Sequence, residues 1–117
     1  MLVADDSRAF LDAAVDVINV TRGFELVGTA GSGEEAVELA ASTRPDLVLL
    51  DVRMPGISGR EAASRIRRAS PRTNIVLMTA DSAQSIAGET SFTYGLLDKR
   101  TLTPAALTAA WEEFGRS

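Results

Sequence analysis

Five side chains that could do chemistry together stand near the ends of short apolar runs in this sequence. In chain order they are Asp5, Asp6, Asp51, Thr79 and Lys99. If the apolar runs are parallel strands, their carboxyl ends meet at one edge of a sheet, which is where such sheets bind ligands. We therefore expect three carboxylates, one hydroxyl and one ammonium group to converge on a single crevice.

Three carboxylates brought close together favour a bound cation. Their charges repel, and at least one pKa would rise unless a cation neutralises them. Carboxylates suit a hard cation such as Mg²⁺ or Ca²⁺, and Mg²⁺ is held by one or two of them together with water and substrate oxygens. Such a metal would draw a phosphoryl group toward Asp51, whose carboxylate could act as a nucleophile and form an aspartyl phosphate. Thr79 could then hydrogen-bond a phosphoryl oxygen, and Lys99 could neutralise its charge.

The composition excludes several other kinds of site. The 117 residues include no cysteine and no histidine, which removes disulfides, thiolate nucleophiles, the commonest general base and the usual zinc ligands. The formal net charge is −4 and no block of basic residues is present, so nonspecific nucleic-acid binding by this chain is not expected. No apolar stretch reaches the ~18 residues of a membrane span and no signal-peptide pattern is present, so no membrane association is expected.

Strand-like runs and amphipathic helical segments alternate along the chain. Strands are expected at residues 1–4, 25–30, 47–50, 74–78 and 94–97. A helix is expected after each strand, the fourth and weakest at residues 81–92. Capping boxes at Ser32 and Ser58 and a threonine–proline start at Thr103 mark three helix beginnings, and Gly23 is expected to end the first helix.

This alternation predicts an α/β fold. Five strand–helix pairs in one chain favour a doubly wound (βα)5 domain, with a parallel five-stranded sheet in the flavodoxin-like order 2-1-3-4-5 and helices on both faces. The length suits one domain covering residues 1–117. Because the chain opens on its first strand and closes on its last helix, no output domain is expected within it.

The site residues and their surroundings resemble the receiver domains of bacterial response regulators, the phosphoacceptor half of two-component signalling. The resemblance is carried by the DD pair after the first strand, the LLDVRMPGISG stretch around Asp51, the LMTA stretch containing Thr79 and the DK pair at Lys99. The family's D-x-x-M-P-x-x-x-G pattern is met from Asp51 to Gly59. The match extends over essentially the whole chain.

The resemblance implies a role for each of these residues. Asp51 would be the phosphoacceptor, and Thr79 and Lys99 would contact the phosphoryl group. Asp6, Asp51 and the backbone carbonyl of Arg53 would ligate Mg²⁺, and Asp5 would act on it through a water molecule. The chain would then be a switch that catalyses only its own phosphorylation and dephosphorylation, rather than an enzyme acting on a free substrate.

The resemblance also implies partners and a location. A sensor histidine kinase or a phosphotransfer protein would supply the phosphoryl group in the cytoplasm. The surface of the fourth helix, fifth strand and fifth helix would carry the signal to an output domain or to a second copy of the chain. Two positions depart from the family's pattern, because Leu96 stands where an aromatic switch residue is usual and Arg100 stands where a proline usually follows the lysine. These departures argue against the usual aromatic switch, not against phosphorylation.

Four other interpretations of these residues compete with the receiver resemblance. Asp6 could simply be the N-cap of the first helix. A phosphatase with an aspartyl nucleophile usually needs an acid two positions later, where Arg53 cannot donate the proton. In an FMN-binding protein, Asp5 and Asp6 would repel the phosphate. A pseudo-receiver, which is an interaction module that is never phosphorylated, normally lacks one or more of the acids; this chain keeps them all, and the alternative stays open.

Overall fold

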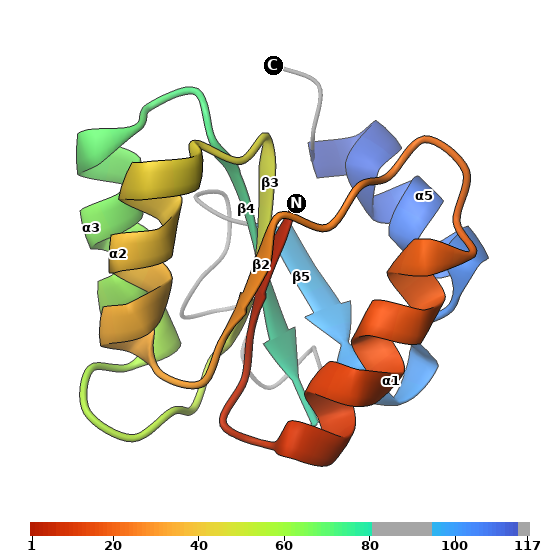
Figure 1. The fold of residues 1–117 in the computed structure, drawn as a ribbon, viewed down its shortest axis with the longest axis horizontal. Coiled ribbons are helices and arrows are strands. Elements are labelled where there is room, and N and C mark those ends of the chain that lie inside the picture. Colours follow the sequence, from red (N-terminus) through yellow and green to blue (C-terminus); the bar gives the residue numbers. More distant parts are fainter. Residues whose placement is uncertain (81–94, 115–117) are drawn as a thin grey trace.

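The computed structural model describes residues 1–80 and 95–114, and the expected fourth helix at 81–92 lies outside these residues (Figure 1). The elements are β1 (Leu2–Ala4), α1 (Arg8–Asn19), β2 (Gly28–Ala30), α2 (Gly33–Thr43), β3 (Leu47–Asp51), α3 (Gly59–Ala69), β4 (Asn74–Thr79), β5 (Gly95–Asp98), the 3-10 helix η1 (Lys99–Thr101) and α5 (Pro104–Phe114). The strands form a parallel sheet in the order β2-β1-β3-β4-β5. This order confirms the predicted doubly wound α/β fold.

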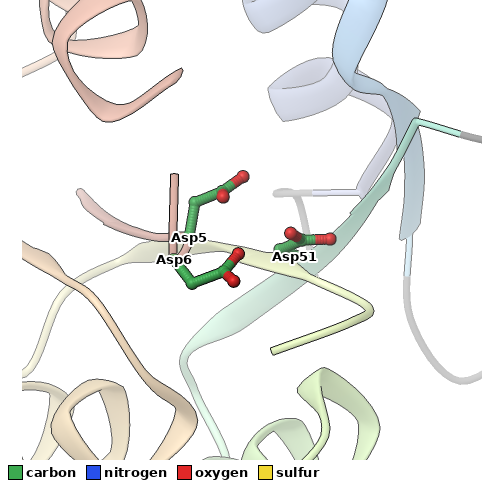
Figure 2. A group of neighbouring side chains, drawn as sticks. All are labelled: Asp5, Asp6 and Asp51. Atoms are coloured by element: carbon green, nitrogen blue, oxygen red, sulfur yellow. The ribbon is translucent and has the colours of Figure 1, made fainter. Parts of the chain in front are cut away.

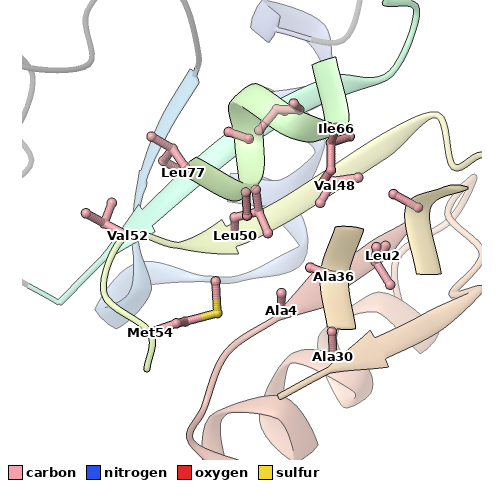
Figure 3. Packing of buried hydrophobic residues seen from close by; sticks show 14 residues of the cluster. Leu2, Ala4, Ala30, Ala36, Val48, Leu50, Val52, Met54, Ile66 and Leu77 are labelled. Carbon is pink, nitrogen blue, oxygen red and sulfur yellow. The ribbon is translucent and has the colours of Figure 1, made fainter. Parts of the chain in front are cut away.

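The sheet separates two apolar layers. Helices α2 and α3 cover one face, and α1 and α5 cover the other (Figure 1). Along β3 the side chains alternate: Val48 and Leu50 pack with α2 and α3 (Figure 3). Leu47 and Leu49 pack with α1 and α5 on the other face. A central parallel strand is buried on both faces, which explains the unbroken apolar run that precedes Asp51.

Short polar side chains begin the helices where the sequence predicts. Ser32 Oγ accepts a hydrogen bond from the Glu35 backbone N–H at 3.1 Å, and Ser58 Oγ accepts one from the Glu61 N–H at 3.2 Å. Thr103 Oγ1 does the same at the start of α5, at 3.1 Å from the N–H of the third helical residue. Each cap satisfies a donor that the first turn of a helix leaves without a partner.

Several element boundaries differ from the prediction, most of them by one residue: β1 begins at Leu2, β3 ends at Asp51 and β4 ends at Thr79. Strand β2 covers only Gly28–Ala30, because it lies at the sheet edge and pairs with the three residues of β1 alone. Strand β5 runs one residue further than expected, since Asp98 pairs with Thr79. Helix α1 ends at Asn19, and Gly23, at φ +90°, belongs to the turn that follows rather than to the helix cap. β-branched residues near the end of α1 disfavour a longer helix.

Candidate functional site

The three aspartates meet at the carboxyl ends of β1 and β3 (Figure 2). Asp5 and Asp6 follow β1, and Asp51 is the last residue of β3. One carboxylate oxygen from each lies within 4.8 Å of the other two. Asp5 is fully buried, Asp51 is 7% exposed and Asp6 is exposed to solvent. The prediction that these carboxylates converge is therefore confirmed.

Local hydrogen bonds orient two of these carboxylates. Asp5 Oδ1 accepts the backbone N–H of Ser7 at 2.8 Å, and Asp51 Oδ1 accepts that of Arg53 at 3.2 Å. Both are bonds to the residue two positions on, which is typical of aspartate in a turn. Ser7, not Asp6, caps helix α1, because its Oγ accepts the Phe10 N–H at 3.2 Å. The capping role considered for Asp6 is thus taken by its neighbour, and the Asp6 carboxylate stays with the cluster.

Lys99 joins two strand ends through its ammonium group. Its Nζ lies 2.5 Å from Asp5 Oδ2 and 3.3 Å from Asp51 Oδ2. The lysine reaches them from η1, directly after β5. Two carboxylates that repel each other are thereby held beside one positive charge, so the ion pairs link three strands of the sheet at the site.

Burial and nearby charges shift the pKa values of Asp51 and Lys99. Desolvation is the main reason that the pKa of Asp51 is raised, and the Asp5 charge adds to it against the opposing effects of the Arg53 N–H and Lys99. For Lys99, desolvation is the largest single influence and acts to lower the pKa. The Asp5 hydrogen bond and the charges of both carboxylates outweigh it, so the pKa of Lys99 is raised. At neutral pH the ammonium stays charged.

The raised pKa of Asp51 predicts that ionised Asp51 lowers the folding stability of the metal-free protein, by an amount that depends on pH. A carboxyl whose folded-state pKa exceeds its unfolded value destabilises the fold when ionised, and the cost disappears as the pH falls through the folded pKa. Asp51→Asn should therefore raise the melting temperature in EDTA at pH 7, with a difference that narrows on acidification. Thermal unfolding monitored by circular dichroism measures this. Asp46→Asn, an exposed site at the other end of β3, is the control; a less stable Asp51→Asn protein at pH 7 would contradict the prediction.

Thr79 and Arg53 lie beside this cluster. Thr79 ends β4, is 3% exposed and pairs in register with Asp98, while its neighbour Met78 pairs with Asp51. The fold thus brings Thr79 to the same sheet edge, as predicted. Arg53 is exposed, and its backbone N–H faces Asp51. Its carbonyl as a metal ligand stays a prediction.

The two residues that depart from the family's pattern have defined surroundings. Leu96 is partly buried and packs against the core layer of α2 and α3. Arg100 lies in η1, and its guanidinium donates to both oxygens of Asp98, from Nε at 3.0 Å and from Nη2 at 2.7 Å. The Asp98 Oδ1 also accepts the Arg100 backbone N–H at 2.8 Å. These bonds define the start of η1, the turn from which Lys99 extends.

One residue of the site was missed at the level of sequence. The ring centroid of Phe10, from the first turn of α1, lies 4.6 Å from Lys99 Nζ. In the sequence Phe10 is an ordinary aromatic residue at the start of an amphipathic helix. Its place five residues after Asp5 indicates that Phe10 lies near the same sheet edge. That spacing alone does not show whether its ring packs in the core or contacts the site.

Comparisons with known proteins agree with this geometry. The model of the response regulator receiver domain family matches residues 1–104. The chain is 35% identical over 116 residues to protein-glutamate methylesterase/protein-glutamine glutaminase 2 of Anaeromyxobacter dehalogenans, covering 99% of this chain and 33% of that protein. It is 42% identical over 90 residues to the transcriptional regulatory protein PdtaR of Mycobacterium tuberculosis, covering 74% of this chain and 41% of that protein. The chain thus spans about a third to two fifths of these relatives.

A solved structure gives the same result. The signal receiver domain of the response regulator NarL from Mycobacterium tuberculosis superimposes with a TM-score of 0.84 at 29% identity, covering 96% of this chain and 91% of that one. The chain belongs to the response regulator receiver domain family. Within the described residues, no helix is long and apolar enough to cross a membrane.

Proposed function

We propose that this domain is a phosphorylation-dependent switch in which Asp51 accepts a phosphoryl group from a histidine kinase or a phosphotransfer protein. The observation that carries the proposal is the bridge of Lys99 between Asp5 and Asp51, beside the Asp6 carboxylate. It combines a cluster of negative charge that suits a divalent cation with a fixed positive charge next to the nucleophile. Family membership supports the same reading.

The residues present fit the Mg²⁺ that receiver domains use. Carboxylate oxygens from the three aspartates lie close enough together for one ion, and the exposed Asp6 leaves the site open to solvent. Asp6, Asp51 and the Arg53 carbonyl would hold the ion, and Asp5 would act through water. When bound, Mg²⁺ supplies positive charge that offsets the clustered carboxylates and the phosphoryl oxygens.

The protein's own residues supply the remaining chemistry. An oxygen of the Asp51 carboxylate attacks phosphorus, the P–N bond of a phosphohistidine breaks, and the imidazole leaves with the electron pair of that bond. The product is an acyl phosphate on Asp51. The Lys99 ammonium neutralises the charge of the transferred group, and the Thr79 hydroxyl donates to one of its oxygens.

As such a switch, residues 1–117 would form one receiver domain that works in the cytoplasm. Its signalling surface would combine strand β5, helix α5 and the segment before β5, and its targets would be an output domain or a second copy of the chain. Because Leu96 packs in the core layer of α2 and α3, the signal would travel through repacking of an aliphatic side chain rather than through an aromatic rotamer change. A pseudo-receiver is the alternative function, and the retained acids argue against it.

Binding of a phosphoryl mimic tests the proposal directly. Mg²⁺ with beryllofluoride should shift the amide NMR signals of Asp51, Thr79 and Lys99 in the wild-type domain. Mg²⁺ alone should give a smaller set of shifts confined to the aspartates. A pseudo-receiver would show no beryllofluoride response at any concentration, and that result would overturn the proposal.

Magnesium binding should also stabilise the fold. A ligand that binds only the native state adds about 2.7 kcal/mol at a free concentration of about 100 times its dissociation constant. We expect the free energy of unfolding to rise with Mg²⁺ in this way, and the midpoint of the titration to move to higher Mg²⁺ in Asp6→Asn. Urea unfolding at graded Mg²⁺ measures both. Asp12→Asn, which alters an exposed carboxylate on α1, should behave like the wild type; equal midpoints for Asp6→Asn and wild type would exclude Asp6 as a ligand.

A further inference from the structure

The ammonium group of Lys99 contacts two kinds of neighbour. Asp5 and Asp51 approach it as charged groups, at 2.5 and 3.3 Å. The Phe10 ring approaches it as a neutral group, with the ring centroid 4.6 Å from Nζ. A cation within about 6 Å of an aromatic centroid is attracted by the negative face of the ring. Lys99 is therefore held by carboxylates and by an aromatic ring together.

The position of Phe10 does not depend on the charges of the site. Phe10 is the third residue of α1, and its backbone N–H is fixed by the Ser7 cap at 3.2 Å. Its side chain is partly buried and packs against the core layer of α1 and α5. Leu97 and Leu102, which flank Lys99 in the sequence, pack against the same layer. The Phe10 ring and the residues on either side of Lys99 therefore pack in the same core layer, which keeps the ring close to the lysine.

A divalent cation at the site would weaken the ion pairs of Lys99 with the carboxylates but would not weaken its attraction to the Phe10 ring. The carboxylates that contact Lys99 belong to the cluster that would hold Mg²⁺. A dication there competes with the ammonium for the same negative charge and weakens those ion pairs. The ring is neutral and is not among the possible ligands, so its attraction for the ammonium persists. If the ring were absent, a lysine side chain released from its carboxylates would regain its rotamer freedom.

We infer that Phe10 is a positioning residue that keeps the Lys99 ammonium at the site while the aspartates are occupied by a cation. The ammonium is then already in place when a phosphoryl group arrives at Asp51. The inference rests on the proposed function, because it concerns how the same site is made ready. It predicts that the aromatic face at position 10, rather than apolar volume, is what the site requires.

The chain offers an unusually clean probe of this contact, because Lys99 is its single lysine. Labelling with [13C]lysine gives one ε-methylene signal, and a nearby ring face shifts its protons upfield. We expect this shift in the wild type and in Phe10→Tyr, with and without saturating Mg²⁺, and its loss in Phe10→Leu. If Mg²⁺ abolishes the shift in the wild-type protein, the lysine leaves the ring on metal loading and the inference is wrong.

Affinity for beryllofluoride in saturating Mg²⁺ gives the functional readout. Phe10→Leu should weaken binding about 3–10-fold, the range that a cation–π contact supplies, while Phe10→Tyr should stay close to the wild type. In a Lys99→Ala background, Phe10→Leu should have no further effect. An equal loss in both backgrounds would show that the ring acts through packing alone, and no loss in either would show that it is dispensable.

These outcomes separate the inference from the proposed function. If the wild-type domain does not bind beryllofluoride, the proposed function fails and the inference fails with it. If the wild type binds and Phe10→Leu binds equally well, the inference alone fails. If circular dichroism shows that Phe10→Leu is unfolded, Phe10→Met takes its place. If Lys99→Ala does not bind beryllofluoride, the ε-methylene signal of Lys99 in the wild-type and Phe10 variants decides the outcome.

Discussion

Asp51→Asn is expected to abolish phosphoryl incorporation from a small donor such as acetyl phosphate in the presence of Mg²⁺. The asparagine amide is nearly isosteric with the carboxylate but offers no anionic oxygen to attack phosphorus. Removal of a nucleophile should reduce labelling by roughly 100-fold or more. Incorporation measured by intact-protein mass spectrometry, as a mass gain of one phosphoryl group, checks this.

Two comparisons make the result specific to Asp51. Asp46→Asn removes an exposed carboxylate just before β3, at the opposite end of the strand, and should label as the wild type does. Asp6→Asn should slow labelling but recover part of the rate at high Mg²⁺, because its proposed role is to hold the metal. Robust labelling of the Asp51→Asn protein would show that another residue is the acceptor.

Gly59→Ala should be the most damaging single methyl addition near the site. Gly59 is the first residue of α3, and a Cβ there would lie 2.1 Å from the Asp51 carbonyl oxygen and 2.9 Å from Val52 Cα. Both are backbone atoms of the strand end, and the Gly59 N–H donates to the Val52 carbonyl at 3.0 Å. Neither side can yield without moving Asp51. We expect the free energy of unfolding to fall by about 2–3 kcal/mol, as for other overpacked sites, together with weaker beryllofluoride binding.

The sign of the change in the free energy of unfolding distinguishes a steric clash at Gly59 from an effect of helix propensity. Alanine favours a helix interior over glycine by about 1 kcal/mol, so a site without a clash would gain stability or stay unchanged. Gly31→Ala, just before the Ser32 cap of α2, is a control for the methyl group alone, because its Cβ would meet Glu35 Oε1 at an ordinary 3.7 Å. Chemical denaturation of both variants measures the difference. If Gly59→Ala is as stable as the wild type, the close approach of α3 to β3 is not a constraint.

Much of the fold was predictable because its signals are local. The apolar runs, the capping serines at Ser32 and Ser58 and the threonine at Thr103 each act within a few residues of their own position, and the structure confirms all three helix starts. Two strand boundaries that were wrong depend instead on a partner strand elsewhere in the chain. The length of β2 is limited by β1, and the end of β5 is set by its pairing with β4.

The approach of Asp5, Asp6 and Asp51 to one another was determined by the sequence, because a parallel sheet brings the carboxyl ends of its strands to one edge. The sequence pattern specifies which end of a strand a residue occupies, but not the distance between side chains on different strands. That distance depends on strand register, side-chain rotamers and the burial of neighbouring groups. Only the tertiary structure therefore decided that Lys99 bridges two of the aspartates and that Phe10 contacts its ammonium.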